Sequence, residues 1–210
     1  MAHGGGLDKN GGHNDRKNGG YHCHRDACVS QHKKSDEALN DAVRDERPFS
    51  YVYRREDWKH WSDFDEDCMN TRHEILKSQA DGGIKLSPDG CYVSKSVWND
   101  PFSGKQLTRS SDLDVDHIVP LKWASDHGGV GWTKNEKERF ANDPINLLAV
   151  DDGLNQAKGA KGPTEWMPPN HAFRCHYLRL WVSVLEKYPL LQMKSAEKRT
   201  FMRQLDACKS

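Results

Sequence analysis

Two short stretches of this chain carry residues whose types and spacing could support metal-assisted hydrolysis. The first is residues 114–121, which read Asp-Val-Asp-His-Ile-Val-Pro-Leu, so that Asp116 directly precedes His117. A carboxylate can bind a hard cation while a neighbouring imidazole takes a proton from water. Asp114, two residues before Asp116, is expected on the same side of a strand and adds a further ligand or hydrogen-bond acceptor. The pattern predicts a hydrolytic site at a strand end.

The second stretch begins about 30 residues later with Asn146, and residues 155–163 read Asn-Gln-Ala-Lys-Gly-Ala-Lys-Gly-Pro. If a helix spans residues 152–159, Asn155 and Lys158 share one face, where one can ligate a metal and the other can meet a phosphate. The alternative is that Asp116 and His117 form only a structural ion pair and that Asn146 caps a turn. Because several polar groups converge, we favour the catalytic interpretation.

Periodicity and turn signals predict the elements that position these residues. We expect helices over residues 66–80, 152–159 and 171–188, a hairpin over residues 84–93, and strands over residues 113–121 and 146–150. Thr133 and Glu136 form a capping box that opens another helix, and a last helix antiparallel to residues 171–188 follows. A regular strand would point Asp116 and His117 to opposite faces, so the first strand must bend or end here, as Pro120 favours.

Composition narrows the classes of protein. The chain has 210 residues, and its 31 Lys and Arg balance 31 Asp and Glu, so a nucleic-acid site must be a local basic patch. The longest apolar runs, such as residues 147–150, are far shorter than the roughly 18 residues of a bilayer span. We therefore expect no membrane partner. The Trp residues at positions 58, 61, 98, 132, 166 and 181 are expected in the core and not as platforms for stacked bases.

The six cysteines suggest disulfides and an oxidising compartment, because no pair has the Cys-x-x-Cys spacing of a zinc site. Cys91, in the predicted hairpin, can reach back to Cys68 in the preceding helix. Cys175 and Cys208 lie at matching distances on either side of a turn near Leu191. That spacing predicts a Cys175–Cys208 bridge across the two last helices.

These motifs resemble those of the ββα-metal HNH endonucleases, including the HNH domain of CRISPR effector nucleases. Residues 98–104, 140–143, 166–169 and 175–177 also resemble a branch of bacterial secreted HNH nucleases related to the C-terminal nuclease domain of GmrSD-type restriction enzymes. The resemblance covers about residues 50–191. It implies a ββα-metal centre in which His117 is the general base and Asn146 braces the loop that orients it.

The same resemblance implies that Asp116 and Asn155 ligate one divalent cation, with Asp114 as a weaker candidate ligand. The ion is expected to be Mg²⁺, with Mn²⁺ or another divalent cation as alternatives, and it would neutralise the scissile phosphate. His117 would deprotonate the attacking water, and with an ordinary imidazole pKa of ~6.5 activity should fall in acid. Lys158 and Lys161 would contact phosphate, which carries no sequence information. Nonspecific cleavage to 5'-phosphate ends is implied.

The first 35 residues hold seven of the 17 Gly and five of the 11 His, and they cannot build a core alone. His13, His22 and His24 could together bind Zn²⁺, while a flexible tail is the alternative. The segment resembles YHYH-type modules of bacterial extracytoplasmic proteins. It departs from their Gly-Cys-His by reading Gly-Gly-His at residues 11–13, and without a thiol at position 12 we expect Cys23 to pair with Cys28.

We therefore expect an α+β protein with a ββα-metal centre packed among helices over residues 36–210, preceded by a His- and Gly-rich appendage over residues 1–35. The expected function is a monomeric, metal-dependent endonuclease that cleaves DNA, and RNA as a further substrate, with little sequence specificity. It is expected to be bacterial and secreted or periplasmic, with its leader absent from this chain. The alternatives are a restriction or phage-type HNH nuclease that needs a recognition partner, and a nonenzymatic DNA- or metal-binding protein.

Overall fold

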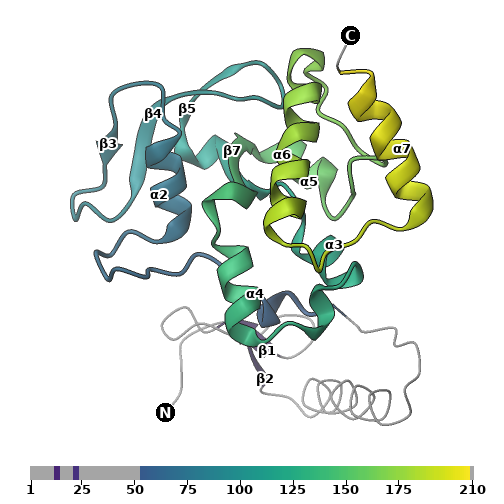
Figure 1. Ribbon diagram of the computed structural model, residues 1–210. Coiled ribbons are helices and arrows are strands. Elements are labelled where there is room, and N and C mark those ends of the chain that lie inside the picture. Colours follow the sequence, from purple (N-terminus) through teal and green to yellow (C-terminus); the bar gives the residue numbers. More distant parts are fainter. Residues whose placement is uncertain (1–11, 15–20, 24–52, 209–210) are drawn as a thin grey trace. The chain divides into compact units, whose positions relative to one another are not determined.

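The computed structural model describes residues 12–14, 21–23 and 53–208 (Figure 1). The chain divides into two units, residues 1–59 and residues 60–210, and each is described by itself. The boundary that the sequence predicts after residue 35 lies outside the described residues and stays a prediction.

In the first unit, β1 (Gly12–Asn14) pairs antiparallel with β2 (Tyr21–Cys23), and His13 lies opposite His22 in the register. A short 3-10 helix, η1, covers Arg55–Asp57. His24 and Cys28 lie outside the described residues. The predicted zinc site and the predicted Cys23–Cys28 bridge therefore stay predictions.

Two small antiparallel sheets organise the second unit. The first has the order β3-β4-β5, formed by Lys85–Leu86, Val93–Asn99 and Gln106–Arg109. Its β3 and β4 form a hairpin where one is predicted, but β4 begins only at Val93, the last residue of the predicted second strand, and β5 is a strand that the sequence analysis missed. The second sheet pairs β6 (Leu113–His117) with β7 (Leu147–Asp151). Small sheets among many helices agree with the expected α+β class.

The first predicted helix is shorter than expected, because α2 covers only Thr71–Ser78. Glu66 and Cys68, which the prediction had placed inside it, have φ values of 58° and 76°. This left-handed backbone is incompatible with a right-handed helix. Asn70 sets the actual start, since its side chain accepts a hydrogen bond from the backbone N–H of His73 as an N-cap.

The strand predicted over residues 113–121 ends earlier, at His117. The chain turns after His117, and α3 begins at Leu121 directly after Pro120, which has no N–H and is tolerated at a helix start.

The predicted capping box is confirmed, because Thr133 and Glu136 hydrogen-bond reciprocally at the start of α4. The helices α5, α6 and α7 lie where expected, with residues 171–188 divided into a 3-10 turn and α6, whereas α3 is a helix that the sequence analysis missed. Bounds are Leu121–Asp126 for α3, Lys134–Ala141 for α4, Asp152–Lys158 for α5, Arg174–Lys187 for α6 and Ser195–Asp206 for α7; 3-10 helices cover Ser110–Asp112 (η2), Gly129–Gly131 (η3), Pro144–Asn146 (η4) and His171–Phe173 (η5).

An apolar cluster joins α2, β4 and one face of the β6-β7 pair. Its fully buried members are Ile75, Leu76, Val93, Trp98, Leu113, Val115, Leu147 and Ala149. Gln79, just after α2, locks the helix onto β7, since its side-chain amide donates to the carbonyl of Leu147 and accepts from the N–H of Ala149 at 3.0 and 2.8 Å. The β6-β7 pair is thus fixed from the side of α2.

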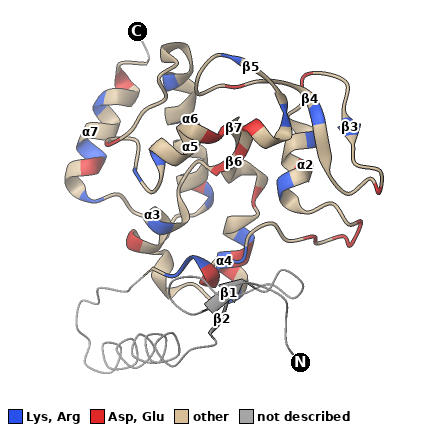
Figure 2. Cartoon of the chain, turned by 180° about the vertical axis from the view of Figure 1, so that it is seen from behind, with Lys and Arg blue, Asp and Glu red and all other residues tan. Residues whose placement is uncertain are grey.

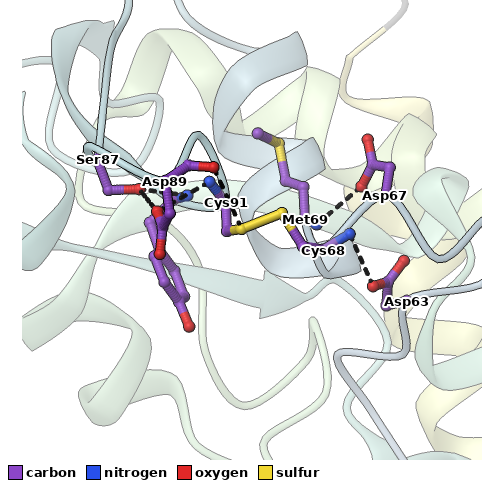
Figure 3. Close-up of a disulfide and its surroundings, with 8 residues drawn as sticks. Asp63, Asp67, Cys68, Met69, Ser87, Asp89 and Cys91 are labelled. Carbon is purple, nitrogen blue, oxygen red and sulfur yellow. Dashed lines mark hydrogen bonds between the residues drawn. A yellow bond between two sulfur atoms is a disulfide. The ribbon is translucent and has the colours of Figure 1, made fainter.

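Two of the predicted disulfides are present. Cys68–Cys91 joins the segment before α2 to the β3-β4 hairpin (Figure 3), and Cys175–Cys208 joins the start of α6 to the residue after α7. The second bridge requires α6 and α7 to run antiparallel, and Figure 1 shows them side by side. Among the described residues, none of the helices is both long enough and apolar enough to cross a bilayer.

Candidate active site

The polar face of β6 is turned toward α5. Asp114 and Asp116 alternate along the strand and share this face, and Asn155 and Lys158 sit three residues apart on the facing helix. The side-chain amide of Asn155 donates to Oδ2 of Asp114 at 3.0 Å, and Nζ of Lys158 donates to Oδ1 of Asp116 at 2.7 Å. Figure 2 shows acidic positions on β6 and β7 beside α5. The predicted convergence of strand and helix side chains is therefore present.

Lys158 is completely buried, and its ammonium also donates to the backbone carbonyl of His117 at 2.8 Å. Burial lowers the pKa of Lys158, while the charge and hydrogen bond of Asp116 act in the opposite direction. In this structure Lys158 thus meets protein oxygens, and its predicted contact with phosphate stays a prediction. It instead supplies the positive charge that makes a buried Asp116 tolerable.

Asp116 is 3% exposed, and burial raises its pKa to about 6 even though Lys158 favours the carboxylate. Burial also raises the pKa of Asp114, which lies near Asp152. Among the described residues, Oδ2 of Asp116 has no hydrogen-bond partner. A buried carboxylate oxygen without a hydrogen-bond partner lowers the free energy of unfolding unless a ligand binds it.

The residues present fit a hard divalent cation. Oδ2 of Asp116 lacks a protein partner, and Asn155, which turns its amide nitrogen to Asp114, retains an amide oxygen. Carboxylate and amide oxygens are the ligands that Mg²⁺ and Ca²⁺ prefer. These two side chains, with Asp114 beside them, are the ones that could hold the ion.

His117 leaves the strand on the side opposite to Asp116, because consecutive strand residues alternate. It is 6% exposed, and its Nε2–H donates to the backbone carbonyl of Ala141 at the end of α4, at 2.8 Å. A carbonyl can only accept, so the neutral ring is held with its proton on Nε2 and its lone pair on Nδ1.

An aromatic side chain also lies against His117. The ring of Trp61 is stacked on the imidazole with centroids 5.5 Å apart and an interplanar angle of 25°. His60 meets both rings edge-on, at 5.3 Å from Trp61 and 6.3 Å from His117. The sequence analysis assigned Trp61 to the core, and no local motif marks its position beside His117.

Asn146 is fully buried and bonds to the loop that follows His117. Its side-chain oxygen accepts from the N–H of Val119 at 2.8 Å, its amide donates to the carbonyl of Val119 at 3.2 Å, and its own carbonyl accepts from the N–H of Ile118 at 2.8 Å. This arrangement fixes the path of the chain directly after His117. It is the geometry that a residue bracing this loop requires.

The remaining predicted residues lie outside this cluster. Lys161 is exposed, and its ammonium donates to the carbonyl of Ala157 at 2.8 Å, near the end of α5. His13 and His22 belong to the first unit, where only their backbone register is described.

A second group of carboxylates escaped the sequence analysis. Asp63, Asp65 and Asp67 are exposed, and each offers an oxygen within 4.8 Å of the others, so together they could hold a cation. Asp63 and Asp67 also accept from the backbone N–H groups of Cys68 and Met69 (Figure 3). The alternating Asp-x-Asp-x-Asp order, with Glu74 as the twelfth residue counted from Asp63, is the spacing of oxygen ligands in calcium loops. That order is the signal that could have found the group.

Comparison with known proteins gives two similarities. A family model described as "GmrSD restriction endonucleases, C-terminal domain" matches residues 77–201. The chain is 38% identical over 159 residues to an "Uncharacterized secreted protein" of Arthroderma benhamiae, a match that covers 74% of this chain and 76% of that protein. That relative is fungal, so the expected bacterial origin and the YHYH-type module stay predictions. No solved structure matches the chain.

Proposed function

This chain belongs to the GmrSD restriction endonuclease C-terminal domain family, and on that premise we propose that it is a metal-dependent endonuclease of the HNH type. Its substrate is DNA, cleaved with little sequence specificity, and RNA is a second substrate to be tested. In this proposal β6, β7 and α5 form the ββα-metal centre. The observation that carries it is that β6 ends in two consecutive functional residues: Asp116, whose buried Oδ2 lacks a partner among the described residues, and His117, whose Nε2 is held by the Ala141 carbonyl.

The chain's own residues divide the work. Nδ1 of His117 takes the proton from the attacking water, and the Ala141 carbonyl keeps the opposite ring nitrogen protonated throughout. Asn146 fixes the backbone after His117 and so limits the directions that the ring can take. Asp116 and Asn155 would hold a divalent cation, expected to be Mg²⁺, with Asp114 nearby. When bound, such an ion neutralises charge on the phosphate and on the departing oxygen. Hydrolysis would leave 5'-phosphate and 3'-hydroxyl ends.

Substrate contacts are proposed for the region beyond α5. Lys161 is exposed at the end of that helix, where its ammonium can exchange a backbone carbonyl for a phosphate oxygen. Contacts of this kind are indifferent to base sequence and weaken as salt is raised. Little sequence preference follows from them.

Secretion is also part of the proposal. Two disulfides within residues 68–208 require an oxidising compartment to form and persist. The relative from Arthroderma benhamiae is named a secreted protein. An extracellular or periplasmic nuclease satisfies both observations.

A plasmid-nicking assay tests the function directly. The purified protein should relax supercoiled DNA with Mg²⁺ and stop when EDTA removes the ion. His117→Ala should cut about 10³-fold more slowly, because the general base is lost. His176→Ala, which removes an exposed histidine on α6, is the matched control and should cut normally. Intact plasmid with the wild-type protein would support a nonenzymatic DNA- or metal-binding protein instead, and equal cutting by His117→Ala would show that His117 is not the general base.

The description of the matching family supports one other candidate function, a restriction-type nuclease. Its description refers to restriction endonucleases, whose cleavage depends on recognition of particular DNA. Sequencing the ends cut from a random duplex library separates the two functions. Ends spread over all sequences support the nonspecific nuclease, whereas ends gathered at one motif, or cleavage only after a partner is added, support the restriction type.

A further inference from the structure

His117 is supported on two sides by segments that are far apart in the sequence. The carbonyl of Ala141 holds the edge of the ring through Nε2, and the indole of Trp61 covers a face of the ring. A hydrogen bond alone fixes one ring nitrogen but leaves the plane able to rotate about that bond. A stacked aromatic ring restricts this remaining rotation.

The two supporting segments are bonded to each other. Ser62 follows Trp61, and Asn142 follows Ala141. The backbone N–H of Ser62 donates to the side-chain oxygen of Asn142 at 2.9 Å, and the hydroxyl of Ser62 donates to Glu138 at 2.6 Å. Trp61 and the Ala141 carbonyl are therefore parts of one bonded frame around His117.

The backbone at Trp61 is held in an unfavourable conformation. Its φ is 62°, in the left-handed region that bulky residues rarely adopt. Such a conformation persists where neighbouring contacts hold it, and here Thr71 donates to the carbonyl of Ser62 through both its N–H and its hydroxyl, at 2.9 and 2.7 Å. Backbone preference alone would not turn the indole toward His117.

We propose that Trp61 is a positioning residue for His117: its stacked indole fixes the plane of the imidazole that acts as the general base. The inference rests on the proposed function, in which His117 is the general base. Trp61 also packs against the apolar cluster of α2 and β4, so a purely structural role is the competing explanation. The test must separate the two.

Steady-state cleavage of a short labelled duplex with Mg²⁺ makes that separation. Trp61→Ala should lower kcat about 10- to 100-fold, because misplacing a reacting group slows chemistry. KM should change less than about twofold, since substrate contacts remain. Trp61→Phe keeps a stacking ring and should stay within about threefold of the wild-type kcat. Trp166→Ala is the matched control, because Trp166 is also half-buried but packs on Phe102 and Tyr177. It should leave kcat unchanged.

The His117→Ala background gives the sharper comparison. A residue that acts only through His117 has nothing left to position there, so adding Trp61→Ala should change the residual rate less than about twofold. A merely structural defect would slow both backgrounds by the same factor. That result, or a folded Trp61→Ala with wild-type kcat, would overturn the inference while leaving the nuclease function in place.

A measurement without DNA covers the case in which the proposed function itself fails. ¹³C relaxation of the His117 ring reports how far the plane of the imidazole moves. The wild type should show a rigid ring and Trp61→Ala a more mobile one, with thermal unfolding used to confirm that the variant is folded. An equally rigid ring in both proteins contradicts a positioning role whether or not the protein cuts DNA.

Discussion

The five residues of β6 alternate between two faces of the strand, and different interactions hold each face in place. On one face Leu113 and Val115 pack into the apolar cluster with α2 and β4. On the other, Asp114 and Asp116 meet Asn155 and Lys158 of α5 through hydrogen bonds and an ion pair. His117 ends the strand on the apolar side, yet it is held by a carbonyl and an indole.

The two faces of this strand should therefore respond to different kinds of substitution. Apolar burial contributes free energy of folding roughly in proportion to the area removed from water. A buried ion pair offsets its own desolvation only while both partners are present. The apolar face should therefore be sensitive to lost volume, and the polar face to lost charge balance.

The largest expected effect is on the polar face. Lys158→Met keeps a similar side-chain volume but leaves the carboxylate of Asp116 buried without its cation. The free energy of unfolding should fall by about 3–5 kcal/mol, the cost of breaking a buried pair from one side. Urea unfolding in the absence of divalent ions measures it.

The double variant Asp116→Leu with Lys158→Met is the matched control for this prediction. With both charges removed, most of the lost stability should return, although the protein should no longer cut DNA. A Lys158→Met protein as stable as the wild type would mean that the ion pair of Asp116 and Lys158 does not contribute to the free energy of unfolding.

A smaller loss is expected on the apolar face. Leu113→Ala should lower the free energy of unfolding by about 2–4 kcal/mol, because a fully buried side chain leaves a cavity. Cleavage by the protein that remains folded should stay within about threefold of wild type, since the side chain of Leu113 packs into the apolar cluster on the other face of β6. Leu190→Ala, at an exposed leucine, is the control and should cost less than about 0.5 kcal/mol. A large loss of activity in folded Leu113→Ala would contradict the division between the faces.

The smallest effect concerns pH and the helix that covers the apolar face. Burial, with a further contribution from Arg72, lowers the pKa of His73 on α2 to about 4, and Nδ1 of His73 accepts the N–H of Val93 at 3.2 Å. Between about pH 6.5 and 4 the unfolded chain binds a proton at this residue and the folded chain does not, so stability is full above 6.5 and falls as pH drops through this window.

Urea unfolding of wild type and His73→Gln at pH 7 and pH 5 isolates this contribution. The wild type should lose about 1 kcal/mol more than the variant over that interval, a figure reduced for solvent screening at a half-buried ring. Equal losses would show that His73 is not kept neutral by the fold.

Much of the site could be predicted because its signals are local. The capping box at Thr133 needs only residues three apart, and the shared face of Asn155 and Lys158 needs only a helix. The two disulfides followed from a hairpin and a pair of helices whose lengths fix where the sulfurs meet. In each case short-range geometry decides the outcome.

What escaped prediction depends on contacts between distant segments. The ammonium of Lys158 is turned inward by oxygens of Asp116 and His117, some 40 residues earlier in the chain. The position of Trp61 depends on bonds from Ser62 to Glu138 of α4 and to Asn142, the C-cap of that helix. The left-handed backbone at Glu66 and Cys68, which shortens α2, has no marker such as glycine in the sequence.

The two cross-links described above flank the centre without enclosing it. One closes residues 68–91 and the other residues 175–208, and the 83 residues of the intervening stretch, 92–174, contain no cysteine. A mild reductant would therefore cleave the bridges that hold the β3-β4 hairpin and α7. It would break no covalent bond within β6, β7 or α5. Reduction should therefore make the hairpin and the terminal helix more sensitive to proteases. Molecules that have not yet been cleaved should keep the catalytic rate of the oxidised protein.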